Sequence, residues 1–102
     1  MIASETVDGV IFAALHALNR ERTAEDQISL SSQTPLFGAD SQIDSLSLVS
    51  LIVDVETTLN ADHGLAISLA DDRALARKQS PYASVETLRD YVLELAGEEG
   101  KA

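Results

Sequence analysis

The stretch "DSLSLVSLIVDVETTLN", residues 44–60, contains the apolar pattern that decides the fold. Successive residues of a helix are about 100° apart, so side chains within about 60° of Leu48 share one face. That inner face comprises Leu48, Leu51, Ile52, Val55 and Leu59. The pattern predicts a helix over about residues 45–60 that docks on a hydrophobic core and ends near Gly64, which can adopt the left-handed conformation of a helix terminus.

The same helix carries a second group of apolar residues, the outer strip, which consists of Leu46, Val49 and Val53. These residues lie roughly 100–160° from the inner face, where a helix on the surface of a small bundle normally presents charged side chains. Two explanations are open. Either the long loop before the helix folds over the strip, or a partner protein binds it.

Amphipathic patterns on both sides of this helix predict two further long helices. The first covers about residues 4–20, with Ser4 as its N-cap, and the last opens at Ser84 and ends before a flexible tail, residues 97–102. Their apolar faces consist of Val7, Val10, Ile11, Ala14, Leu15 and Leu18 in the first helix, and Val85, Leu88, Val92 and Leu95 in the last.

A long loop is predicted between the first two helices. Residues 23–43 contain Pro35 and Gly38 and show no sustained helical pattern. Apolar side chains within the loop can hold it against the core. These are Ile28, Leu30, Leu36 and Phe37.

Between the second and last long helices, the sequence predicts an extended piece around Ile67 and a short helix over about residues 70–78, which stops before Pro81. The chain, residues 1–102, is therefore predicted to be one all-α domain with its core over about residues 4–96. Its architecture is a small four-helix bundle, with three longer helices and one short one and a long loop between helices one and two.

The charge and composition of the chain exclude several classes of function. Seventeen Asp and Glu against seven Lys and Arg give a net charge of −10, which repels nucleic acids and anionic lipid and favours basic partner proteins. Cysteine is absent, which excludes disulfides, thiolate metal sites and a cysteine nucleophile. The N-terminal stretch resembles neither a secretion signal nor a membrane span, so we expect a cytoplasmic location. We also expect the protein to be a monomer.

No catalytic or metal-binding residue set is predicted. His16 is interpreted as a partly buried packing residue and His63 as a solvated loop residue, and nothing pairs them. Asp40 and Asp44 lack the regular acids, the internal glycine and the closing glutamate of a calcium loop. We therefore expect a protein that is not an enzyme and binds no metal.

Ser45 is the residue that the pattern singles out for function. It lies in the first turn of the second helix, where unpaired amides and the positive end of the helix dipole favour a phosphate group on its oxygen. A purely structural interpretation is also open, in which Asp44 is an N-cap and Ser45 only starts the helix. Ser41, inside the loop, is interpreted as a turn residue.

The sequence "DSL" at the start of an apolar helix that reaches Glu56 resembles the attachment region of the acyl carrier protein family. The similarity extends from about Val7 to Leu95 and includes the small acidic chain, the order of predicted helices, the long loop, and "VETLRDYV" in the last helix. The resemblance implies a carrier, active in fatty acid or other lipid metabolism, that holds acyl groups as thioesters on 4′-phosphopantetheine.

The resemblance also implies roles for single residues. Ser45 matches the attachment serine, Asp44 its acidic neighbour and Leu46 the apolar contact beside the arm. Leu46, Val49, Val53 and Glu56 match positions that meet partner enzymes, and these partners are a phosphopantetheinyl transferase and acyl-loading, condensing or acyl-transferring enzymes. Leu51, Ile52 and Val55 match positions that line the space which shelters an acyl chain.

Several features depart from the family pattern. The family usually has glycine two residues before the Asp of its motif, and here Gly38 and Asp40 reproduce that spacing beside Ser41, which keeps Ser41 as a second candidate. Ser50 and Thr57 stand where typical fatty-acid carriers often have glutamate. The long stretch 61–80 carries a group of basic residues, which either contacts an acidic partner protein or forms a solvated helix face. That group consists of Arg73, Arg77 and Lys78.

These departures favour a specialised carrier over a housekeeping one, for an unusual acyl group or an aminoacyl group. A different class of function also fits the sequence. A helical interaction module without a cofactor would use the outer strip to bind a partner's groove, and would explain the acidic charge and the surplus apolar residues equally well.

Overall fold

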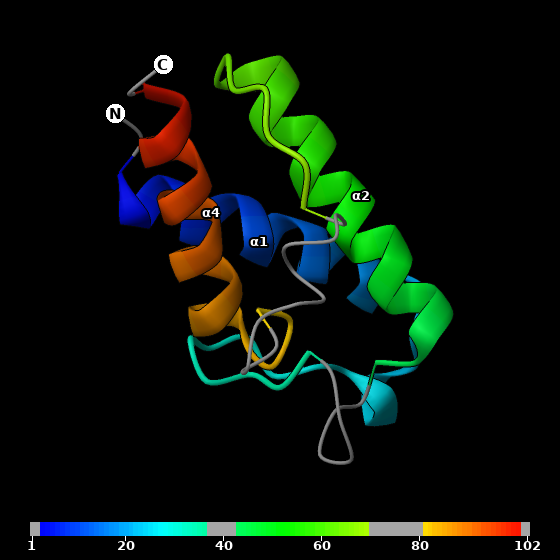
Figure 1. Cartoon of the computed structure of the whole chain (residues 1–102). Coiled ribbons are helices and arrows are strands. Elements are labelled where there is room, and N and C mark those ends of the chain that lie inside the picture. Colours follow the sequence, from blue (N-terminus) through cyan, green and yellow to red (C-terminus); the bar gives the residue numbers. More distant parts are fainter. Residues whose placement is uncertain (1–2, 37–42, 70–80, 101–102) are drawn as a thin grey trace.

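The computed structural model describes residues 3–36, 43–69 and 81–100 and shows a mostly helical fold (Figure 1). Its α-helices are α1 (Ser4–Asn19), α2 (Ser45–Asp62) and α4 (Val85–Gly100), and a 3-10 turn, η1 (Ala24–Asp26), follows α1. The described ranges contain no β-strand. The all-α prediction is confirmed, whereas the four-helix count is not, because the predicted short helix over residues 70–78 lies outside the described residues.

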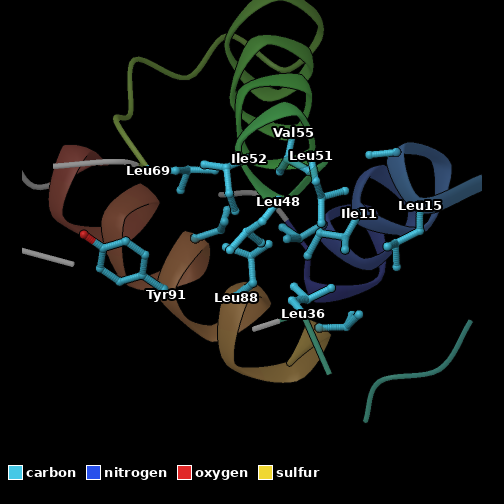
Figure 2. Close-up of a cluster of buried hydrophobic side chains, with 14 of the residues drawn as sticks. Ile11, Leu15, Leu36, Leu48, Leu51, Ile52, Val55, Leu69, Leu88 and Tyr91 are labelled. Carbon is cyan, nitrogen blue, oxygen red and sulfur yellow. The ribbon is translucent and has the colours of Figure 1, made fainter. Parts of the chain in front are cut away.

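The inner face of α2 forms the centre of the hydrophobic core, as the spacing predicted. α1 packs against both α2 and α4, and side chains from all three helices meet in one cluster (Figure 2). The buried apolar residues of the helices are Val7, Ile11, Ala14 and Leu15 from α1, Leu48, Leu51, Ile52, Val55 and Leu59 from α2, and Val85, Leu88, Tyr91, Val92 and Leu95 from α4. Val10 and Leu18 are half-buried against the cluster.

The helix ends confirm some of the predicted capping and correct the rest. Ser84 caps α4 as predicted: its amide donates to Thr87 Oγ1 (2.9 Å), and its Oγ accepts from the Thr87 amide (3.3 Å). Gly64, just after α2, has φ 68°, the left-handed conformation expected of it. Ser4 is not the cap of α1, because it is already helical and Ala3 holds the capping position without a side-chain hydrogen bond.

Two helices run further than predicted. α2 continues to Asp62, and α4 continues to Gly100, so the backbone of residues 97–100 is helical where we expected a tail. Glutamate is a good helix former, and α4 contains no proline that would stop it. Residues 101–102 lie outside the described residues.

Two asparagines near helix ends hold the chain that follows each helix. Asn19, the last residue of α1, is buried, and its side chain forms two hydrogen bonds with the backbone of Ile28, from Nδ2 to the carbonyl (3.0 Å) and from the Ile28 amide to Oδ1 (2.7 Å). Asn60 repeats this pairing with Ile67, at 3.0 and 3.1 Å. Each asparagine side chain therefore forms hydrogen bonds with both the backbone amide and the backbone carbonyl of a buried isoleucine, as a neighbouring β-strand would.

The long loop is also fixed to the start of α4. The carbonyls of Thr34 and Ser32 accept the amides of Val85 (3.1 Å) and Glu86 (2.8 Å), the first two residues of that helix. Amides in the first turn of a helix have no acceptor within the helix, so the loop carbonyls serve as their hydrogen-bond acceptors. Of the four apolar residues predicted to hold the loop against the core, Ile28 and Leu36 are buried there, which confirms the prediction for them. Leu30 is 43% exposed and does not hold the loop. Phe37 lies outside the described residues.

We predict that Asn19→Ala lowers the free energy of unfolding by about 1–3 kcal/mol, because it leaves both polar groups of Ile28 buried without partners. Asn60→Ala is the matched control. It removes the same pair of hydrogen bonds at a half-buried side chain, where water can replace them, so its effect should be smaller. Urea unfolding followed by circular dichroism measures both. Equal stability of Asn19→Ala and the wild type would contradict this account.

Candidate functional site

The Asp44–Ser45 step is the point at which the loop becomes a helix. Asp44 is the N-cap of α2, with extended backbone (φ −77°, ψ 171°), and its Oδ1 accepts from the Ser47 amide at 2.7 Å. Its carbonyl accepts from the Leu48 amide at 2.9 Å, so Ser45 is the first helical residue. Ile43 before the cap and Leu48 after it both belong to the buried core, the arrangement of a hydrophobic staple, which fixes where the chain enters α2.

The hydrogen bonds at this cap keep the Asp44 carboxylate charged. The Ser47 backbone amide contributes most, the Ser47 hydroxyl contributes next, and the more distant Arg22 contributes least to lowering the pKa of Asp44 below its ordinary value of 3.8. A charged carboxylate therefore stands directly before Ser45 at neutral pH.

The outer strip is open to solvent. Leu46 is 78% exposed, Val49 59% and Val53 51%, so the described part of the long loop, residues 23–36 and 43, does not cover the strip. The loop instead packs at the start of α4, through Thr34 and Ser32. Glu56, three residues after Val53 and half-buried, extends the same side of α2 by one turn.

A small apolar pocket of about 120 Å³ lies beside the strip. Its lining consists of Leu48, Val49, Ile52, Val53 and Tyr82. Tyr82 belongs to the segment before α4, and its hydroxyl donates a hydrogen bond to the Leu69 carbonyl. Sequence reasoning missed Tyr82, since neither periodicity nor a motif connects residue 82 with a helix that ends twenty residues earlier, at Asp62.

A larger open groove, about 450 Å³, lies between α1 and α2 on the opposite flank of α2 from the pocket. Ala14 and Leu51 are its buried apolar residues, and Glu21 and Asp54 add negative charge at its edge. The groove begins at Leu46 and Ser47, so both flanks of α2 offer surface close to the helix start.

The remaining predicted positions divide into those that the structure places and those that it does not describe. His63 is exposed after α2, as predicted, but His16 is exposed rather than partly buried, because it lies on the outer side of α1 from Ile11 and Leu15. Within the described ranges, no three His, Cys, Asp or Glu side chains gather as a metal site. Asp40, Ser41, Arg73, Arg77 and Lys78 lie outside the described residues.

None of the helices in the described ranges has the length and apolar character needed to cross a bilayer. Comparisons of the chain with protein-family models, with curated proteins and with solved structures found no match. A functional assignment therefore depends on the residues and geometry of this site.

The low pKa of Asp44 predicts how its contribution to stability depends on pH. Because the folded pKa lies below 3.8, this contribution is present above pH 3.8 and is lost as the pH falls through the folded pKa. Asp44→Asn is the control, since asparagine also caps helices but does not titrate. From neutral pH to about pH 2, the wild type should lose more stability than the variant. The Ser47 amide proton, followed by NMR, should report a midpoint below 3.8, and a midpoint above it would contradict the cap.

Proposed function

We propose that the protein is an acyl carrier protein that holds acyl intermediates as thioesters on 4′-phosphopantetheine, which is attached to Ser45 by a phosphodiester. The observation that carries this proposal is the placement of Ser45. It is the first residue of α2, directly after a capping aspartate, and it begins the helix whose outer strip is exposed to solvent. A serine at this junction combines a modifiable hydroxyl with an adjacent surface for partner enzymes.

The proposed carrier would obtain its thiol from the cofactor, because the chain has none of its own. The protein has no cysteine, so it cannot itself form a thioester, and a pantetheine arm supplies the sulfur. The carrier then acts as a tethered substrate. Attachment through a short flexible arm raises the effective concentration of the cargo at a docked enzyme to about the millimolar range.

The outer strip and Glu56 are the proposed docking surface. Its partners are a phosphopantetheinyl transferase and the enzymes that load, condense or transfer acyl groups. Exposed apolar side chains give such a complex its contact area, and the net charge of −10 speeds encounter with basic enzymes more than it strengthens the final complex. Fast release suits a carrier, because it has to visit several enzymes in turn.

A second candidate function is a cofactor-free interaction module. The exposure of the outer strip favours it as much as it favours a carrier, since three apolar side chains at helical spacing can fill a partner's groove. The two functions differ in one property, which is whether Ser45 is covalently modified.

We predict that co-expression with a phosphopantetheinyl transferase adds the mass of one phosphopantetheine group to the wild type and none to Ser45→Ala. Intact-mass spectrometry measures the addition, and a known carrier in the same cells is the positive control. Ser41→Ala is the matched variant, in the second Asp-Ser pair, and it should be modified fully. Modification of Ser45→Ala would move the site to Ser41, and an unmodified wild type would favour the interaction module.

We further predict that Leu46→Ala slows modification by about tenfold, because the loss of an interface contact of this size costs on the order of 1–2 kcal/mol. Leu30→Ala is the matched control, because Leu30 is also an exposed leucine but lies outside the outer strip. Neither substitution should change the free energy of unfolding by more than about 0.5 kcal/mol. Equal modification rates for the two variants would show that the strip does not contact the transferase.

A further inference from the structure

The open groove between α1 and α2 lies where the two helices pack and both present short side chains (Figure 1). α1 contributes Ala14 and Ala17 to its lining, and α2 contributes Ser47 and Ser50. The floor consists of core residues, since Ala14 and Leu51 are buried. At about 450 Å³, the groove is roughly three times the size of a cavity of about 150 Å³ that holds benzene. It therefore has room for two or three large apolar side chains of another molecule.

The length of the groove matches a short stretch of helix. Its lining runs from Ala14 to Glu21 along α1 and from Leu46 to Asp54 along α2. At about 1.5 Å per residue, these rows extend over about 10 and 12 Å, which is about two turns of a helix. An amphipathic helix that lies in such a groove can place apolar side chains from successive turns on the floor.

The charge of the groove selects a basic occupant. Glu21 and Asp54 are exposed at its edge, and none of the described residues in its lining is basic. Arg20 and Arg22, which flank Glu21 in the chain, do not belong to that lining. The net charge of −10 also repels a second copy of this chain, nucleic acid and anionic lipid. A protein segment that carries Lys or Arg beside apolar residues complements both the floor and the edge.

The groove lies on a different side of α2 from the outer strip. At about 100° per residue, its α2 positions centre about 170° from the position of Ser45 and more than about 100° from Val49 and Val53. These groove positions are Ser47, Ser50, Leu51 and Asp54. Leu46 is common to both surfaces, because it belongs to the outer strip and also lines one end of the groove. A helix in the groove therefore leaves Val49, Val53 and the position of Ser45 accessible.

From these observations we propose that the groove between α1 and α2 is a second docking surface, which binds a basic amphipathic helix of a partner protein. Apolar side chains of that helix cover Ala14 and Leu51, and its Lys or Arg side chains pair with Glu21 and Asp54. The partner can stay bound while the outer strip contacts a different protein. The proposal goes beyond the proposed function, because binding in the groove requires no modification of Ser45.

The test titrates the unmodified full chain with a synthetic amphipathic peptide of about 14 residues, made of Leu and Lys at helical spacing. NMR follows the backbone amides. Those of Ala17, Ser50 and Leu51 should shift in a saturable way, whereas those of Val49 and Val53 should shift little. A peptide with Glu in place of every Lys is the control, and it should not bind, since its charge has the same sign as that of the protein.

Two double variants with the same net charge separate the groove from the general acidity of the chain. Glu21→Gln with Asp54→Asn removes both groove charges, and Glu5→Gln with Asp62→Asn removes two exposed charges elsewhere on α1 and α2. The control positions lie more than about 10 Å along each helix from the lining, beyond the screening length of about 8 Å at 0.15 M salt. The groove pair should raise the Kd of the Lys peptide about three- to tenfold, and the control pair less than about twofold.

A second pair of variants tests the space in the groove. Ser50→Phe adds a bulky ring to the lining and should prevent saturable binding of the Lys peptide. Thr57→Phe is the matched control, because Thr57 is also an exposed residue of α2 but does not line the groove, and it should leave the Kd unchanged. Circular dichroism verifies that both variants are folded.

Each other outcome overturns the proposal. Shifts confined to Val49 and Val53 would assign the basic helix to the outer strip. Equal binding of the Glu peptide, or equal weakening by the two double variants, would show that the groove does not select its occupant by charge. Groove amides that shift with protein concentration alone would assign the groove to a second copy of the chain. None of these results bears on whether Ser45 is modified, so the proposed function is tested separately.

Discussion

The burial of the inner face of α2 is the constraint on which the rest of the structure depends. Each fully buried Leu, Ile or Val contributes about 1.5–3 kcal/mol relative to its exposed state, and this face contains five such residues. No cap or surface ion pair in a small domain approaches that total. Turning α2 about its axis to bury the outer strip would expose the inner face, so the position of the core also determines that Leu46, Val49 and Val53 face solvent.

A second set of interactions fixes where α2 begins, and it combines hydrogen bonds along the loop with the burial of Ile43. Asn19 holds Ile28, and the carbonyls of Ser32 and Thr34 cap α4, so the described part of the loop is attached at both ends of its course. Ile43 is then buried directly before the Asp44 cap. The start of α2 is therefore a fixed position, which is what a covalently attached arm requires if docking is to aim it.

These features are the ones that the proposed carrier would use. The described residues that surround Ser45 along α2 are a capping carboxylate, exposed apolar side chains and a small uncharged pocket. The chain contains no cysteine, so none of its own side chains supplies a thiol. A chemical group brought in by a cofactor, and enzymes that bind the helix surface, would supply what this set of side chains lacks.

The sequence by itself determined the helical class, the inner face of α2, the caps at Asp44 and Ser84, and the left-handed turn at Gly64, because each depends on residues close together in the chain. Only the tertiary structure decided that the described part of the loop leaves the outer strip exposed, which side of α1 His16 occupies, and that Tyr82 meets Val49 and Val53 across a pocket. These facts follow from how separate elements pack, and local periodicity contains no information about which surfaces meet. The loop packs against α4 because the unpaired amides of that helix attract its carbonyls, and a one-dimensional pattern does not show that competition.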